Sequence, residues 1–292
     1  MDGTCNGLQH YSAIGRDQIG GKATNLINCE TPQDIYLEVL NILDKELEKD
    51  IHENIDAAKN WKEHLNREIV KAAVMTTPYG VTEYGLKRET EGCGMVGSIG
   101  KNVNYLSQKL KSAIGDVVKA APMHMKWLQS VAREFARNNI PIVWKTPIGF
   151  TVYQAYKPQS KKELRTSKHR ITLYIENSQE KLSSNRNTQS LPPNFIHSLD
   201  SSHLTLTVIE AFEHYGISSF AMVHDSYGVH AYNCEDFSQV IRNTFSKMYR
   251  KDILGEFRQS LLSLSPHIKL DNVPKAGSLD INQVITSKYF FS

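Results

Sequence analysis

The sequence predicts an α+β fold with an antiparallel sheet, and two observations support this. Segments with apolar residues at helical spacing occupy much of the first half of the chain, whereas segments that alternate and are rich in β-forming residues gather in the second half. The elements follow one another in a mixed order, without the regular alternation of strand and helix that a doubly wound parallel sheet requires.

Length and composition describe a globular chain. The 292 residues are 40% hydrophobic and 22% charged, which excludes a disordered tail or a collagen-like repeat and allows one large domain or two modest ones. No apolar run approaches the roughly 18–20 residues that a membrane-spanning helix needs. The four cysteines lack CxxC spacing, so we expect free thiols in a reducing compartment; they are Cys5, Cys29, Cys93 and Cys234.

Four helical segments are expected along the chain. Residues 31–34 (Thr-Pro-Gln-Asp) predict a helix start, with Thr31 as the cap and Pro32 at the first helical position. A second helix is expected over about 61–75, and a third over about 103–138 with an interruption near Pro122. The fourth begins at about residue 201 and ends at Gly216 as a C-cap.

The expected strands lie in the second half. Residues 149–156 and 171–175 alternate with period two and predict the two strands of one extended hairpin. Between them, residues 157–170 hold six cations and one acid, a local charge of +5, although the whole chain carries only +3. Residues 178–193 are rich in Ser, Asn and Pro and predict a loop, and residues 219–231 predict a strand, a tight turn and a strand.

Asp225 interrupts the apolar residues of that last strand pair. A carboxylate in such a place must be paired, hydrogen-bonded or metal-bound to offset its desolvation. The alternative is that Asp225 stabilises its own turn beside Ser226 and Gly228, and on this segment alone the two interpretations are balanced. The Asp2-Gly3 pair has the same ambiguity.

A stripe of four side chains precedes Gly80. Arg67, Lys71, Met75 and Tyr79 recur every four residues, so they share one helix face. Two cations and an aromatic hydroxyl suit a nucleoside triphosphate, whereas the alternative is an ordinary amphipathic helix with solvated cations. Pro78 predicts that the helix kinks or ends just before Tyr79. Two separated acids together with this stripe favour the functional interpretation.

These segments resemble the C-terminal catalytic part of the bacteriophage/mitochondrial-type single-subunit DNA-directed RNA polymerases. Residues 2–10 are similar to motif A of that family, residues 67–80 to motif B, and residues 223–226 to motif C. Residues 194–204 resemble the segment before motif C, and the ending at 289–292 resembles the mitochondrial branch. The similarity runs through essentially the whole chain in the order of the family.

The resemblance implies a right-hand polymerase fold with helical fingers and the later part of an antiparallel palm. Residues 1–30 would then be palm with motif A, and residues 204–292 palm with motif C and a C-terminal tail. The fingers would span residues 31–203, including a motif B helix at 61–80 and a basic specificity-type hairpin at 149–193. The N-terminal and thumb regions of the family have no counterpart here, so we expect either an abrupt start or a missing upstream part.

The implied reaction is template-directed nucleotidyl transfer from ribonucleoside triphosphates by a two-metal mechanism. Asp2 and Asp225 would hold two Mg²⁺ ions, with the Gly3 carbonyl as a further ligand. Lys71 would neutralise or protonate the leaving pyrophosphate.

The substrate contacts are also implied by the resemblance. Arg67 would hold the phosphates, and Tyr79 and His203 would check the ribose 2′-hydroxyl, because a site that hydrogen-bonds a hydroxyl rejects sugars without one. His10 and His197 are expected to be structural.

A family A DNA polymerase is the nearest rival, since it shares the spacing from Lys71 to Tyr79. Those enzymes generally carry a glutamate where this chain has Gly7, and it excludes the ribose hydroxyl. Their motif C usually has an acid where Ser226 stands. Both differences favour ribonucleotides.

The basic hairpin corresponds in position to the promoter-specificity loop of the family. Its cations would contact DNA phosphates, and the alternative is a solvated basic loop. The cations expected to bind DNA are Lys161, Lys162, Arg165, Lys168 and Arg170.

The expected partners are DNA template and promoter, RNA product and ribonucleoside triphosphates, with the missing N-terminal part or an initiation factor in addition, and no membrane. We expect a mitochondrial location, with a plastid or a phage-infected cytoplasm as alternatives. The competing function is a truncated, inactive remnant that only binds nucleic acid.

Overall fold

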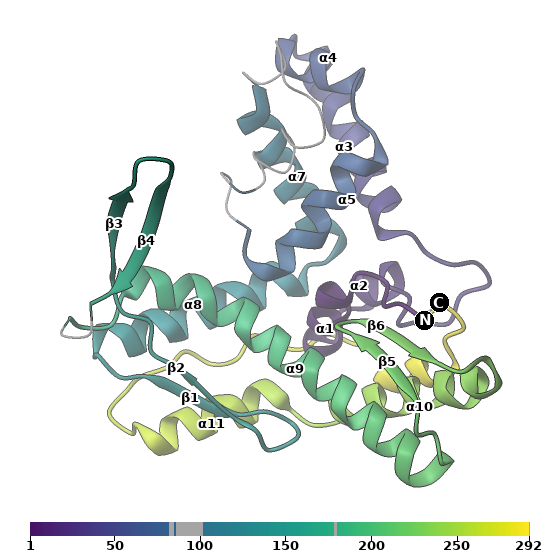
Figure 1. The fold of residues 1–292 in the computed structure, drawn as a ribbon. Coiled ribbons are helices and arrows are strands. Elements are labelled where there is room, and N and C mark those ends of the chain that lie inside the picture. Colours follow the sequence, from purple (N-terminus) through teal and green to yellow (C-terminus); the bar gives the residue numbers. More distant parts are fainter. Residues whose placement is uncertain (82–84, 86–101, 178–179, 292) are drawn as a thin grey trace.

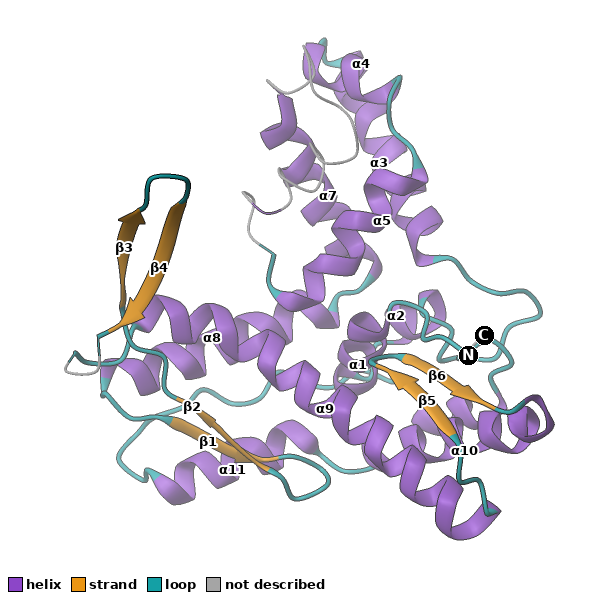
Figure 2. Ribbon diagram, in the orientation of Figure 1, coloured by secondary structure: helices purple, strands orange, loops and turns teal. Residues whose placement is uncertain are grey.

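A computed structural model describes the chain except for residues 82–84, 86–101, 178–179 and 292 (Figure 1). Helices dominate it, and the described strands form two-stranded antiparallel sheets (Figure 2). The mixture agrees with the predicted α+β class. The longer helices are α1 (Asn6–Gly15), α2 (Gln18–Ala23), α3 (Ile35–His52), α4 (Asp56–Lys62), α5 (Arg67–Thr76), α7 (Val103–Val117), α8 (Ala120–Arg137), α9 (Ser184–Tyr215), α10 (Cys234–Tyr249) and α11 (Ile253–Leu264). The strands are β1 (Ile142–Lys145), β2 (Thr151–Gln154), β3 (Gln159–Arg165), β4 (Arg170–Glu176), β5 (Phe220–Val223) and β6 (Ser226–Val229), and the 3₁₀ turns are η1 (Thr77–Tyr79), η3 (Ala231–Asn233) and η4 (Ile281–Thr286).

Helices α3, α4, α5 and α7 rise together from the rest of the molecule (Figure 1). The predicted first helix is confirmed, but its cap is Asp34 and not Thr31, because the Asp34 carboxylate accepts the backbone N–H groups of Tyr36 and Leu37. The single helix expected over about 61–75 is wrong. It is divided into α4 and α5, and the side chain of Asn66 caps the second of these.

Helices α8 and α9 pack against each other beneath this group (Figure 1). The predicted break near Pro122 is confirmed, since α7 ends at Val117 and Pro122 lies in the first turn of α8. The loop expected over 178–193 is confirmed at 180–183 and wrong from residue 184, because α9 begins at Ser184 and continues through Pro192 and Pro193 to the predicted Gly216 cap; residues 178–179 lie outside the described part of the chain. The fourth helix therefore begins earlier than the expected residue 201.

The strand pairing also differs from the expected single hairpin. Residues of β2 pair with β1 in the register Val143↔Tyr153, whereas β4 pairs with β3 from the basic segment. β2 pairs with β1 because a tight turn joins the two strands. In this turn Thr146 N–H donates to the Phe150 carbonyl at 2.8 Å, and Gly149 has φ +84°, which a glycine adopts without strain. The predicted strand, tight turn and strand near residue 225 is confirmed as β5 and β6.

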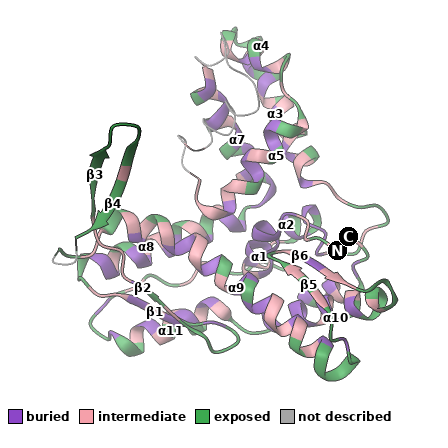
Figure 3. Cartoon of the chain, in the orientation of Figure 1, coloured by how far each residue is buried: buried purple, intermediate pink, exposed green. Residues whose placement is uncertain are grey.

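Buried residues line the facing sides of the helices, whereas β3 and β4 project from the body and are largely exposed on both faces (Figure 3). Cys5, Cys29 and Cys234 are free thiols, as expected, and Cys93 lies outside the described residues. Over the part of the chain that the structure describes, we find no helix with the length and apolar content to cross a bilayer.

Candidate active site

The first three residues lie beside the turn that carries Asp225. Asp2 forms an antiparallel bridge with Ser226, and Gly3 N–H donates to the Asp225 carbonyl at 3.1 Å. Tyr227 N–H donates to the Met1 carbonyl at 2.8 Å and continues the ladder. The two acids, 223 positions apart in the sequence (225 − 2), therefore lie on neighbouring backbones.

Asp225 occupies a two-residue hairpin turn with His224. His224 has φ +52°, a left-handed conformation that costs a non-glycine residue about 1 kcal/mol or more. Burial raises the pKa of the half-buried Asp225 carboxyl, and the charge of Asp2 raises it further, while His224 opposes the shift. Asp225 is thus a turn residue, and it also faces a second acid.

The donor set at this point suits Mg²⁺. Asp2 and Asp225 repel each other, so a cation between them would relieve an interaction that the fold itself imposes. Two carboxylates and the nearby Gly3 carbonyl are hard oxygen ligands, which Mg²⁺ prefers. Among the described residues, no group of three or more His, Cys, Asp and Glu side chains is arranged to hold a metal ion. The candidate ligands are therefore this pair of acids with backbone oxygen.

Tyr79 lies close to the same acids. Helix α5 ends at Thr76 and Tyr79 closes the following 3₁₀ turn, which confirms the helix end predicted from Pro78. Burial raises the pKa of the Tyr79 hydroxyl, and the charges of Asp200 and Asp225 raise it further. The Tyr79 ring stacks on His197, with centroids 4.6 Å apart and planes inclined by 13°.

His203 is not brought to Tyr79. Its side chain is fully buried, its Nε2 lies 3.0 Å from the Ile241 carbonyl, and its Nδ1 lies 3.4 Å from the Tyr227 hydroxyl. Burial lowers the pKa of His203 to about 4, so the ring is neutral near pH 7. A ring enclosed in this way has no face for a nucleotide, and the structural role expected of His197 fits His203 instead.

The phosphate-binding candidates lie on α5. Lys71 is exposed, and the Arg67 guanidinium contacts the Asp34 carboxylate and lies over the Tyr36 ring. The Tyr36 hydroxyl in turn lies near the Cys5 thiol, and burial raises the pKa of that thiol to about 12. Because Cys5 directly follows the segment that pairs beside Asp225, this chain of contacts connects Arg67 to the acids.

Gly7 has a packing role at the junction of α1 and η1. A Cβ atom at this position would lie 2.7 Å from Cβ of Pro78 and 3.2 Å from Cζ of Tyr79. The space that Gly7 leaves is therefore filled by Pro78 and Tyr79, and the glycine allows the Tyr79 ring to approach α1.

Asp200 is a third acid that the sequence interpretation did not select. It lies on α9, one helical turn from His197 on the chain, and only 8% of its surface is exposed. Burial raises its pKa from 3.8 to about 6, the charge of Asp225 adds to the shift, and the neighbouring Asn6 amide opposes it. Its Oδ1 has no hydrogen-bond partner within the described structure. Ionising the Asp200 carboxyl at this position therefore costs free energy in the folded state.

Replacing Asp200 with asparagine is expected to stabilise the protein above pH 6. The folded pKa of about 6 exceeds the unfolded value of about 3.9, so the folded state binds more protons between these values and loses stability as pH rises through them. The gain from Asp200→Asn should therefore be small at pH 4 and reach up to about 3 kcal/mol at pH 8. Urea unfolding of both proteins at the two pH values measures it. An equal stability difference between the two proteins at pH 4 and pH 8 would show that the ionisation of Asp200 is not the cause.

The basic hairpin carries the five predicted DNA-binding cations on exposed strands and their turn. Glu163 pairs with Arg170, and with Lys161 at 3.2 Å. Lys162, Arg165 and Lys168 form no ion pair within the residues that the structure describes. A projecting hairpin with excess positive charge can reach a polyanion without rearrangement of the body.

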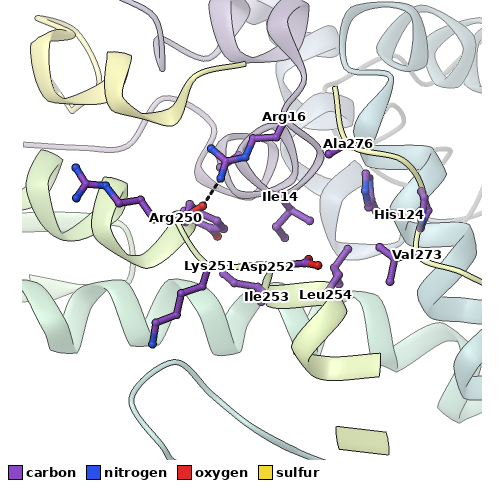
Figure 4. A pocket seen from close by; sticks show the side chains of 13 residues that line it. Ile14, Arg16, His124, Arg250, Lys251, Asp252, Ile253, Leu254, Val273 and Ala276 are labelled. Atoms are coloured by element: carbon purple, nitrogen blue, oxygen red, sulfur yellow. Dashed lines mark hydrogen bonds between the residues drawn. The ribbon is translucent and has the colours of Figure 1, made fainter. Parts of the chain in front are cut away.

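A pocket between α1, α8 and the start of α11 lies apart from these groups (Figure 4). The Arg16 guanidinium donates to the Tyr249 carbonyl at the end of α10, and the Nδ1 of His124 lies 2.7 Å from the Ala120 carbonyl. Its volume of about 180 Å³ is below the 300–1,000 Å³ typical of small-molecule sites. We therefore assign its polar residues a structural role.

Comparison with known proteins agrees with the site. A family model described as DNA-dependent RNA polymerase matches residues 1–266. The whole chain is 36% identical to "DNA-directed RNA polymerase 2A" of Nicotiana tabacum, of which it covers 91%. It is also 36% identical to "DNA-directed RNA polymerase 2B, chloroplastic/mitochondrial" of Nicotiana tabacum and 34% identical to "DNA-directed RNA polymerase 2, chloroplastic/mitochondrial" of Arabidopsis thaliana.

The chain covers about 30% of the length of each of these two longer relatives. The family match extends over more than nine-tenths of the chain, and it includes every site residue described above. The chain therefore belongs to the family of phage-type, single-subunit DNA-dependent RNA polymerases.

Proposed function

We propose that the protein synthesises RNA on a DNA template by nucleotidyl transfer from ribonucleoside triphosphates. The observation that carries this proposal is the backbone ladder that sets Asp2 beside Asp225. In this assignment residues 31–203 serve as fingers, and residues 1–30 and 204–292 as palm. The names of the relatives support an organellar location, in a mitochondrion or a chloroplast.

The reaction joins the 3′-hydroxyl of the transcript to the α-phosphate and releases pyrophosphate. Asp2, Asp225 and the Gly3 carbonyl would hold two Mg²⁺ ions, which when bound lower the pKa of the attacking hydroxyl and neutralise phosphate charge. Arg67 would hold the triphosphate by charge-assisted hydrogen bonds. Lys71, one helical turn further and exposed, would neutralise or protonate the leaving pyrophosphate.

The stacked pair of Tyr79 and His197 would line the ribose. Its proximity to Asp225 supports this role, since both Asp225 and Asp200 act on the Tyr79 hydroxyl. A hydroxyl and an imidazole can each hydrogen-bond a 2′-hydroxyl, and a site with unpaired polar groups rejects a deoxyribose. His197, not His203, is the histidine that we assign to this contact.

Replacing Tyr79 with phenylalanine is expected to reduce the preference for ribonucleotides by about tenfold, the equivalent of one lost hydrogen bond. The ring and its stack on His197 are retained, so the rate with ribonucleotides should change little. The ratio of kcat/KM for ATP and dATP in single-nucleotide extension measures the effect. Tyr232→Phe, at a tyrosine that is 95% exposed, is the matched control. Unchanged discrimination in Tyr79→Phe would remove the hydroxyl from this role.

The β3–β4 hairpin would contact DNA phosphates through its cations. Its exposure and its projection from the body (Figure 1) support this assignment. Such contacts release counterions, so binding should weaken steeply with salt. The promoter would be the DNA that this hairpin contacts, and an initiation factor or the N-terminal part of the family would be a further partner of the protein.

Primer extension by the full-length protein tests the proposed function. An RNA primer on a DNA template is supplied with Mg²⁺ and either ribonucleotides or deoxyribonucleotides. Extension with ribonucleotides supports an RNA polymerase, and extension mainly with deoxyribonucleotides would indicate a DNA polymerase. Binding of the template without extension would support the inactive remnant.

A further inference from the structure

The guanidinium of Arg67 is held between a carboxylate and an aromatic ring. Oδ2 of Asp34 accepts a hydrogen bond from Nε of Arg67 at 2.8 Å, and Nη2 lies 2.8 Å from the same oxygen in an ion pair. The guanidinium carbon lies 4.9 Å from the centroid of the Tyr36 ring, which is within cation–π range. We call Asp34 and Tyr36 the Arg67 socket.

Both socket residues are themselves fixed by the fold. Oδ1 of Asp34 caps α3 by accepting the backbone N–H groups of Tyr36 and Leu37, at 2.9 and 3.2 Å. Tyr36 packs against the hydrophobic core, and its hydroxyl lies near the buried Cys5 thiol just after the Asp2 segment. The socket therefore joins the start of α3, the start of α5 and the segment that carries the first acid.

Among the described residues, Asp34 contacts the guanidinium along one edge, through Nε and Nη2. A guanidinium has five N–H donors, and Asp34 accepts the one from Nε while it pairs with the charge at Nη2. The Arg67 side chain keeps 42% of its surface exposed, so its remaining edge is accessible to a ligand. A planar fork held along one edge can still donate to an anion along the other.

We propose that Asp34 and Tyr36 are positioning residues that orient Arg67 for the triphosphate before the nucleotide arrives. The inference rests on the proposed function, in which Arg67 holds the phosphates. A long side chain that is already held loses less rotamer freedom on binding, which improves affinity without a new contact to the ligand.

Asp34 could instead weaken the binding of the triphosphate, and this alternative also has a physical basis. Asp34 is an anion, and it occupies donors that a phosphate would otherwise use, so it would act as a competitor if Arg67 had to leave it. The accessible remaining edge of the guanidinium makes that departure unnecessary. The two mechanisms predict changes in opposite directions when the carboxylate is removed, and one variant separates them.

Asp34→Asn is the decisive variant. Asparagine caps helices about as well as aspartate, so α3 should keep its start while the ion pair with Arg67 is lost. We expect the KM for ATP in primer extension by the full-length protein to rise about three- to tenfold, with kcat within about twofold. The dissociation constant of ATP, measured by equilibrium binding without primer, should rise by a similar factor. Tyr36→Leu should shift both quantities in the same direction.

Asp44→Asn is the matched control. It removes the carboxylate that pairs with Lys62 further along α3, so KM and the dissociation constant should not change. Thermal unfolding of Asp34→Asn and of Asp34→Ala separates loss of the cap from loss of the ion pair, because only the alanine variant loses both.

Unchanged KM and ATP affinity in Asp34→Asn would overturn the proposal and leave Asp34 as a helix cap. Tighter ATP binding would overturn it in favour of competition, and a fall in kcat alone would overturn it as well. The binding measurement does not depend on catalysis. A protein that makes no RNA but loses ATP affinity in Asp34→Asn would contradict the proposed function and retain the socket.

Discussion

Replacing Asp225 with asparagine is expected to lower the rate of RNA primer extension by about 1,000-fold or more. The side chain keeps its size but loses the charge that would hold a divalent cation opposite Asp2. Losing several kcal/mol of transition-state stabilisation corresponds to a factor of this size. Single-turnover extension at saturating ATP and Mg²⁺ measures the loss directly.

The fold should survive this substitution. Burial and the charge of Asp2 both raise the pKa of Asp225, so neutralising it removes an unfavourable interaction from the folded state. Unfolding by urea should therefore show stability equal to or above that of the wild type. Asp116→Asn, at an exposed acid on α7, is the matched control and should extend primers normally. A folded Asp225→Asn protein with ordinary activity would exclude the acid pair as the catalytic centre.

Replacing Phe290 with alanine is expected to cost about 3–5 kcal/mol of stability, the usual range for a buried phenylalanine. The side chain is fully buried, and its ring centroid lies 4.7 Å from that of Phe245 on α10. The Phe290 carbonyl accepts from the Gln9 amide at 3.0 Å, and the adjacent Phe291 bridges to Gly3. The C-terminal segment thus supports the backbone that carries Asp2.

Urea unfolding measures that cost, and Leu264→Ala is its control. Leu264 is 66% exposed at the end of α11, so its truncation should change the stability by no more than about 0.5 kcal/mol. A loss below about 1 kcal/mol in Phe290→Ala would mean that the C-terminal aromatic cluster does not anchor the fold. Primer extension should fall together with stability, because the bridge from Phe291 to Gly3 weakens with it.

Local sequence patterns predicted the helices and strands that are determined by the order of their own residues. Apolar residues at helical spacing predicted α3. Four of them are buried and Ile42 is half-buried; the buried ones are Ile35, Val39, Leu43 and Leu47. The apolar segments on either side of Asp225 likewise predicted β5, its tight turn and β6.

Elements that depend on distant contacts were not predictable in this way. Pro192 and Pro193 argued against a helix, but both are accommodated in α9, whose neighbouring Leu191 and Phe195 are buried against other elements. The partner of β2 was also misassigned, since periodicity identifies a strand without identifying the strand that it pairs with.

The site shows the same division. The acids and the α5 stripe were selected from the sequence, and their roles stay predictions. Helix phase explains why we propose His197 and not His203 for the ribose: His203 continues the buried row of Ile196 and Leu199, whereas His197 lies on the exposed side with Ser201. Asp200 and the Arg67 socket depend on packing between α9, α3 and α5, which no spacing within one segment reveals.

Template-directed incorporation of one ribonucleotide tests the central claim most directly. The full-length protein is given an RNA primer on four DNA templates that differ only in the first unpaired base, with each ribonucleotide in turn and Mg²⁺. The account predicts that only the complementary ribonucleotide is added, and that Asp2→Asn adds none at a measurable rate. Absence of templated addition by the wild-type protein, or equal addition by Asp2→Asn, would contradict it.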